Sequence, residues 1–160
     1  MSPDSAAFEP LGESDVRAVL DWLDARYGLP AATLAGHRFW HRPGSPALWL
    51  AAAAVSPPRD ARTLAVGLCA FRDPPPRGKP SNVFCLRFGA AATRQVCDLD
   101  GRAPGAAMAY LSGEALSWPD REAHGWVIVR HGGLVLGRGH LSDGVLVGEM
   151  RRSWRAGLSA

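Results

Sequence analysis

Residues 125–140 read Gly-Trp-Val-Ile-Val-Arg-His-Gly-Gly-Leu-Val-Leu-Gly-Arg-Gly-His, and this stretch decides the fold. Two apolar, largely β-branched runs flank the sequence His131-Gly132-Gly133. Paired glycines supply the positive φ angles that a two-residue turn requires. The pattern therefore predicts a β-hairpin.

The second run of this hairpin leads into Gly137, Arg138 and Gly139. Two residues without a Cβ atom let the backbone bend sharply or approach another surface closely. Two interpretations follow. The segment is either a bend in a β-barrel or a loop in which Arg138 contacts a phosphate backbone.

Composition places the chain among ordinary globular proteins. It has 160 residues, of which 47% are hydrophobic, enough for one domain or for two small ones that share an interface. No apolar run reaches the roughly 18 residues of a membrane span. The N-terminus lacks the pattern of a signal peptide, so we expect a cytoplasmic protein without a membrane partner. The net charge of +3 gives a mild indication of an anionic partner.

The cysteines Cys69, Cys85 and Cys97 are odd in number and have no close pair. Their spacing argues against a disulfide framework and against a zinc knuckle, and we expect small buried residues.

Apolar residues recur at helical spacing between Ser14 and Tyr27, which predicts an amphipathic helix covering a sheet. Ser14 is the expected N-cap, and Gly28 is the expected residue after the C-terminus. We expect residues 73–80 to be too rich in proline for a β-ladder. Further expectations are strands at 36–42, 47–51, 63–72 and near 93–99, a short helix at 106–111, a polar loop at 117–123, and either a strand or a helix at 82–88.

Basic and aromatic residues alternate in residues 37–42, His-Arg-Phe-Trp-His-Arg. Such a surface can stack bases and neutralise phosphates, which makes Trp40 a stacking candidate together with Trp154. The alternative is that the aromatic residues are buried and the basic ones keep an edge strand soluble. Trp154 could equally close the open end of a barrel.

The sequence shows no catalytic constellation. It has no Gly-x-Ser-x-Gly elbow, no P-loop and no Gly-x-Gly-x-x-Gly segment opening a helix. The five histidines have no metal-ligand spacing with the cysteines or carboxylates. We expect no enzyme activity, no metal and no cofactor.

The order of the C-terminal motifs resembles the PUA-like domain of Sun-type RNA cytosine-5 methyltransferases. The residues that carry the resemblance are 92–96, 110–116, 125–129, 136–139, 144–146 and 152–155. Residues 27–50 are similar to the pre-PUA module that often precedes this domain. The resemblance implies an α+β fold with a disordered N-terminus (residues 1–12), a pre-PUA-like α/β module (13–76) and a PUA-like mixed β-barrel (80–158).

The resemblance also implies recognition of structured RNA, tRNA or rRNA, by basic side chains, with an RNA-modifying enzyme as a further partner. Carried over by position, Thr93 and Arg94 lie in an ATR-like turn, and Arg138 and His140 lie in the Gly-x-Gly loop. The predicted RNA-binding residues are Lys79, Thr93, Arg94, Arg138, His140, Arg151, Arg152 and Arg155.

The sequence departs from the family pattern at two places, and the first departure removes polar contacts and so counts against RNA binding. Val147 and Gly148 replace a Lys-Asn pair, and Arg151 replaces a proline. The methyltransferase motifs are also absent, so we expect a stand-alone binding module. The rival hypothesis is a protein-interaction domain that lost its RNA surface, and a weaker one is an unrecognised enzyme acting on nucleotides. An exposed apolar patch around Trp40, Trp49 or Trp154 would favour the protein-interaction domain.

Overall fold

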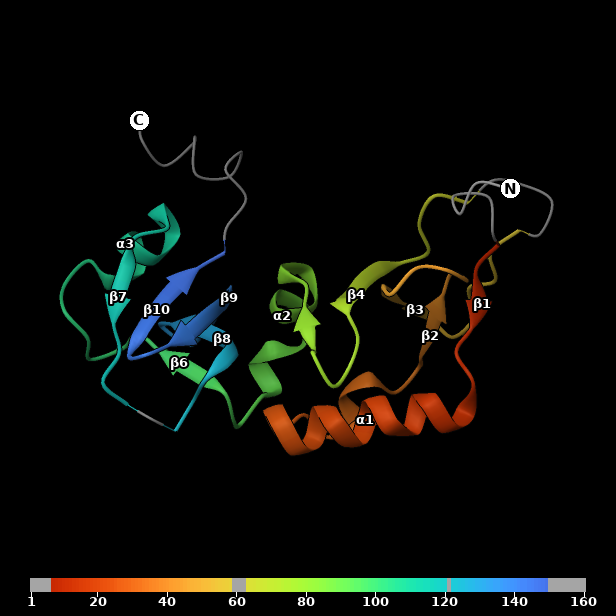
Figure 1. Ribbon diagram of the computed structural model, residues 1–160, viewed down its shortest axis with the longest axis horizontal. Coiled ribbons are helices and arrows are strands. Elements are labelled where there is room, and N and C mark those ends of the chain that lie inside the picture. Colours follow the sequence, from red (N-terminus) through yellow and green to blue (C-terminus); the bar gives the residue numbers. More distant parts are fainter. Residues whose placement is uncertain (1–6, 59–62, 121, 150–160) are drawn as a thin grey trace.

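The computed structural model describes residues 7–58, 63–120 and 122–149. Two five-stranded sheets lie side by side along the long axis of the molecule, with a short helix between them (Figure 1). None of the helices in these ranges is long and apolar enough to span a bilayer.

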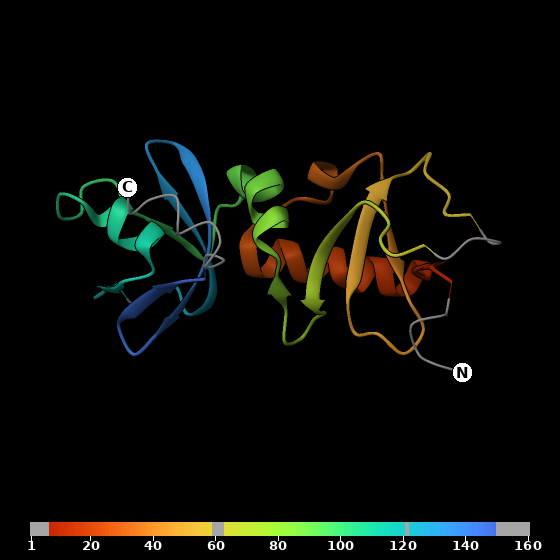
Figure 2. The ribbon, with the colours of Figure 1, turned by 90° about the horizontal axis from the view of Figure 1, so that it is seen from above.

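The first sheet is entirely antiparallel and has the order β1-β2-β3-β4-β5. Helix α1 (Glu13–Tyr27) runs along it, as Figure 2 shows from above. The helix buries Val19, Leu23 and Tyr27. The strands are β1 (Glu9–Pro10), β2 (His37–His41), β3 (Leu48–Ala52), β4 (Leu68–Asp73) and β5 (Lys79–Pro80), and a 3-10 turn, η2 (Ala31–Leu34), precedes β2.

The predicted helix is confirmed, with one difference at its start. It begins at Glu13 with Gly12 as N-cap, and Ser14 caps nothing. At the other end Gly28 adopts φ 61°, and its N–H group donates to the Asp24 carbonyl at 2.8 Å. A residue without a Cβ atom suits this left-handed position, so the helix ends where the sequence indicates.

Three expectations for the first sheet differ from the structure, and the first is the strand at 63–72, which begins only at Leu68 (β4) because Leu64 is exposed and contributes nothing to the core. Residues 9 and 10, expected within a disordered N-terminus, pair with β2, because the neighbouring Phe8 is buried against Trp49. The proline-rich segment does contribute a strand. Lys79 and Pro80 pair with β4 at the sheet edge, where a missing N–H group costs no ladder bond.

Residues 82–88 form a helix, α2 (Asn82–Phe88). Ser81 caps it by accepting a hydrogen bond from the Phe84 N–H group at 3.0 Å. Phe84, Cys85 and Phe88 are buried in the core of the first sheet. The short turn η3 (Gly89–Ala91) then leads to the second sheet.

The second sheet curls into a half-barrel with the order β6-β8-β9-β10-β7. Its strands are β6 (Val96–Asp98), β7 (Ala115–Ser117), β8 (Gly125–His131), β9 (Leu134–Ser142) and β10 (Val145–Gly148), with α3 (Ala106–Ser112) connecting β6 to β7. Strand β6 is parallel to β8, and the other pairs are antiparallel. The hairpin prediction is confirmed, because Gly132 and Gly133 both have positive φ, 57° and 74°.

The glycine segment of the hairpin is a bend inside β9 and not a projecting loop. Gly137 has φ 146°, and the register between β8 and β9 shifts next to it. A Cβ atom on Gly139 would lie 2.6 Å from Leu146 Cδ1. Close packing of the sheet on itself therefore requires this glycine.

Candidate nucleic-acid interface

The two sheets are joined by hydrogen bonds that leave little freedom at the junction. The carbonyl of Tyr27, the last residue of α1, accepts two hydrogen bonds from the segment that enters the second sheet. The donors are the N–H groups of Thr93 and Arg94, at 2.9 and 3.0 Å. Arg130 of β8 donates to the carbonyls of Gly89 and Ala92, at 2.6 Å each. The junction is therefore a fixed surface and not a hinge.

Trp126 organises the basic side chains of this surface. The ammonium of Lys79 lies 4.5 Å from the centre of its ring, and the guanidinium of Arg138 lies 5.1 Å from it. His140, its partner across β8 and β9, packs edge-on at 4.8 Å. Three of the predicted site residues thus meet on one indole, where cation–π attraction favours positive charge.

Arg138 is buried, with 7% of its surface exposed. Its guanidinium donates to the Pro80 carbonyl and, at 2.7 Å, to a carboxylate oxygen of Glu149. The same oxygen lies 3.6 Å from the ammonium of Lys79. Both terminal nitrogens of Arg138 are therefore used within the protein, and the barrel-bend interpretation describes Gly137–Arg138–Gly139 better than the contact-loop interpretation.

Thr93 and Arg94 lie about the C-terminus of α1, on the other side of the junction. Arg94 is exposed and donates one hydrogen bond to the Ala25 carbonyl at 3.0 Å. Thr93 lies against Gly28, with its hydroxyl 3.4 Å from that carbonyl. A cation at this position is favoured by the partial negative charge of a helix C-terminus.

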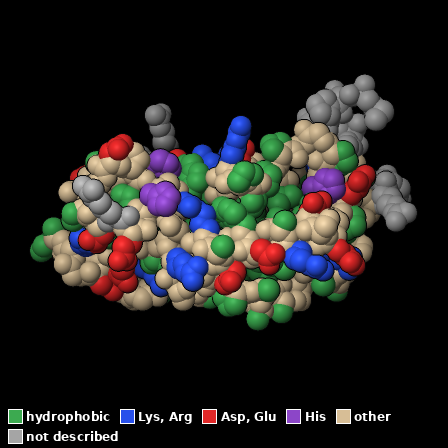
Figure 3. Space-filling model, turned by 60° about the horizontal axis from the view of Figure 1, so that its bottom comes forward, with side chains coloured by type: hydrophobic (Ala, Val, Ile, Leu, Met, Phe, Trp, Pro, Cys, Tyr) green, Lys and Arg blue, Asp and Glu red, His purple; other side chains and the backbone are tan. Residues whose placement is uncertain are grey.

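Arg26 connects the two groups of basic residues. Its guanidinium donates to the His124 carbonyl at 2.7 Å. The guanidinium also lies close to Gly125, the residue before Trp126, because a Cβ atom built on Gly125 would be 3.1 Å from the Arg26 Nη2 atom. We call Arg26, Lys79, Arg94, Trp126 and His140 the junction strip. Figure 3 shows Lys and Arg side chains near the middle of one face of the molecule, with His side chains beside them.

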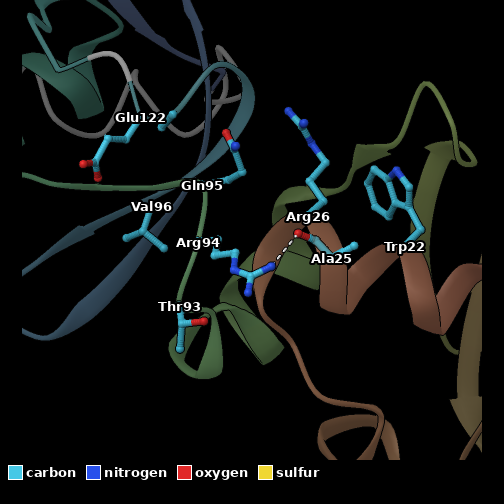
Figure 4. A pocket seen from close by; sticks show the side chains of 9 residues that line it. Trp22, Ala25, Arg26, Thr93, Arg94, Gln95, Val96 and Glu122 are labelled. Carbon is cyan, nitrogen blue, oxygen red and sulfur yellow. Dashed lines mark hydrogen bonds between the residues drawn. The ribbon is translucent and has the colours of Figure 1, made fainter.

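A groove of about 530 Å³ opens between α1 and the segment entering β6. Its lining includes Trp22, Arg26, Arg94, Gln95 and Glu122, so two residues of the junction strip form part of it (Figure 4). Thr93 and Arg94 were the predicted members. Trp22 and Arg26 were missed, although they lie four residues apart on α1 at the margin of its buried stripe, which is the signal that would have indicated them.

Of the other residues that the sequence analysis singled out, two tryptophans belong to the first sheet and four residues lie outside the described part of the chain. Trp40 is buried, so it is not available for base stacking, and Trp49 is half-buried under Phe8. These two tryptophans therefore form no exposed apolar patch of the kind that the protein-interaction hypothesis requires. Arg151, Arg152, Trp154 and Arg155 lie outside the described residues.

The curled sheet, the glycine-bent hairpin and the helix that crosses from β6 to β7 give this part of the chain an α+β fold that is consistent with a PUA-like barrel. Residues 106–156 match the family model described as the PUA domain of methyltransferase RsmF, in agreement with the resemblance read from the sequence. The comparison with curated proteins found no significant match.

Proposed function

We propose that this chain binds structured RNA, such as tRNA or rRNA, through the junction strip. The observation that carries the proposal is the convergence of basic groups from distant parts of the sequence on Trp126 and on the end of α1. Arginine, lysine and histidine side chains next to a half-buried aromatic ring suit a ribose-phosphate backbone. The match to a PUA domain of a methyltransferase supports the same conclusion.

The strip offers phosphates cations that are held in place. Arg94 is fixed by Ala25, Arg26 by His124, and Lys79 by the ring of Trp126 and the carboxylate of Glu149, while each keeps further N–H groups for an external anion. Contacts to phosphates position a protein on RNA without reading its sequence. We therefore expect recognition of RNA shape with little dependence on base sequence in helical regions.

The test is binding of the nuclease-treated protein to labelled tRNA and rRNA fragments across a salt series. Affinity should fall steeply with salt, because cations neutralising phosphates release counterions. Replacing Lys79 and Arg26 together by Gln should weaken binding and reduce the slope of log affinity against log salt by roughly 0.7–0.9 for each phosphate that is no longer neutralised.

The matched control is Arg17→Gln, which removes an exposed cation from the N-terminal half of α1. It should leave the slope unchanged. Because the control removes one charge and the double variant removes two, an equal loss per charge removed would mean that only net charge matters, and would overturn the junction strip as the binding surface.

Two further parts of the proposal, the C-terminal RNA contacts and a role in RNA modification, rest on the resemblance to the Sun-type methyltransferases. Arg151, Arg152 and Arg155 remain predicted RNA contacts, and reversing the charge of the first two should weaken binding and flatten its salt dependence. We also propose a role in RNA modification, in which this chain presents RNA to a modifying enzyme. Co-purification of such an enzyme on immobilised chain, lost on RNase treatment, tests it.

A further inference from the structure

We propose that the groove between α1 and residues 93–96 holds one unpaired nucleotide of the bound RNA. This inference rests on the proposed RNA-binding function and names the feature of the RNA that the site selects. The groove volume of about 530 Å³ lies within the range of about 300–1,000 Å³ usual for small-molecule sites. A nucleobase with its ribose is a ligand of this class.

The α1 wall offers a fixed aromatic surface. Trp22 is half-buried and packs edge-on against Tyr27 and Phe71, with ring centres 5.5 and 5.9 Å apart. Figure 4 shows Trp22 and Arg26 side by side on this wall. An indole and a guanidinium held in place are the groups on which unstacked bases pack.

Gln95 faces them from the opposite wall (Figure 4) and has an unusual backbone. Its φ of 51° lies in the left-handed region that residues with a Cβ atom rarely occupy. Its side-chain oxygen accepts a hydrogen bond from the His124 N–H group at 2.9 Å. Among the described residues its NH₂ group has no protein partner, so the amide is oriented with its donors free for the acceptors of a base edge.

Charge decides which part of a nucleotide enters the groove. Arg26 projects from α1, and the guanidinium of Arg94 reaches across to the Ala25 carbonyl, so both cations lie beside the end of α1, where they suit the phosphates on either side of an unpaired nucleotide. The carboxylate of Glu122 lines the other wall and repels a phosphate there. A neutral base is therefore favoured inside, with the backbone at the rim.

The experiment compares two RNA hairpins of identical stem sequence, one fully paired and one with a single bulged nucleotide. Fluorescence anisotropy at constant salt gives the ratio of the two affinities. The wild-type protein should prefer the bulged RNA about tenfold, because stacking of one base is worth about that factor. Gln95→Gly removes the amide while keeping a residue that tolerates the backbone, and should lower the ratio to about threefold or less.

Asp143→Gly is the matched control, because Asp143 is also a non-glycine residue at positive φ (52°) and lies outside the groove. Its charge change should shift both affinities together and leave the ratio intact. Equal affinity of the wild-type protein for both RNAs, or an unchanged ratio in Gln95→Gly, would overturn the nucleotide site while RNA binding stands. Absence of binding to either RNA would instead overturn the proposed function.

Discussion

The hydroxyl of Tyr27 donates a hydrogen bond to the carbonyl oxygen of Trp126 at 3.1 Å. Tyr27 ends α1, and Trp126 is the second residue of β8, so the bond connects the two halves directly. Burial raises the pKa of the Tyr27 hydroxyl, which keeps it protonated and able to donate. The position of the half-barrel is therefore set by the end of a helix as well as by the chain that connects the sheets.

Tyr27→Phe should lower the free energy of unfolding by about 1 kcal/mol, because it removes this hydrogen bond between the two halves. Urea denaturation followed by tryptophan fluorescence measures the loss. Arg17→Gln, exposed on the same helix, should change stability by less than about 0.5 kcal/mol. Equal stability of the Tyr27→Phe and wild-type proteins would contradict the role of this bond.

Arg138→Met should destabilise the protein by about 2–4 kcal/mol, because it leaves the Pro80 carbonyl without its buried donor and Glu149 with Lys79 as its remaining cationic partner. Arg138→Lys retains the charge but not the two donors of the guanidinium, so this variant should lose less stability than Arg138→Met. Chemical denaturation of the two variants in parallel gives both values. A Met variant as stable as the wild type would mean that the ion pair and its hydrogen bonds are energetically neutral.

The buried cysteines predict a loss of stability at alkaline pH. Burial raises the pKa of the Cys85 and Cys97 thiols to about 12, well above the ordinary value of a thiol. Above about pH 9 the unfolded chain releases these protons while the folded protein keeps them, so the free energy of unfolding should fall as pH rises. Each of the two thiols contributes at most about 1.4 kcal/mol per pH unit to this fall in the free energy of unfolding.

Thermal unfolding between about pH 8 and pH 11 measures this dependence, and Cys85→Ala with Cys97→Ala should make it shallower. Thiol reagent at about pH 8 should label Cys69, which is half-buried, faster than the other two in the native protein. Equal labelling of all three thiols before unfolding would contradict the burial that the prediction rests on.

Gly139→Ala should cost about 1–3 kcal/mol through overpacking. Its Cβ atom would lie 2.6 Å from Leu146 Cδ1 and 3.2 Å from Val129 Cγ2, and both side chains are fully buried. Gly12→Ala is the control for packing, because its Cβ atom would meet only Asp15 Oδ2, at 3.7 Å, and its loss should be limited to less than about 1 kcal/mol from an unfavourable N-cap residue. Similar losses in the two variants would show that the bend in β9 tolerates a side chain.

The hairpin and α1 could be predicted from the sequence because their signals are local: a pair of glycines at a turn, and a glycine after an apolar stripe. Strand β5 and helix α2 could not, since each depends on a distant partner. Lys79 pairs with the edge of β4, and Phe84 packs into the core that α1 and the first sheet form.

The candidate site was predictable only in part for the same reason. A basic residue in a glycine segment looks exposed in the sequence, yet Arg138 is buried between Pro80 and Glu149. Conversely, nothing in the spacing of Lys79, Trp126 and His140 indicates that they meet, because β5, β8 and β9 bring them together from separate parts of the chain.

The parallel pairing of β6 with β8 has a consequence for expression fragments. The segment that matches the family model begins at residue 106, after β6 has ended at Asp98. A fragment trimmed to that match would remove the strand that pairs Val96 with Ile128 and Cys97 with Val129. It would leave one edge of β8, whose Val127, Ile128 and Val129 are fully buried in the whole chain, free to recruit a strand from another molecule, and such a fragment should aggregate where the whole chain does not.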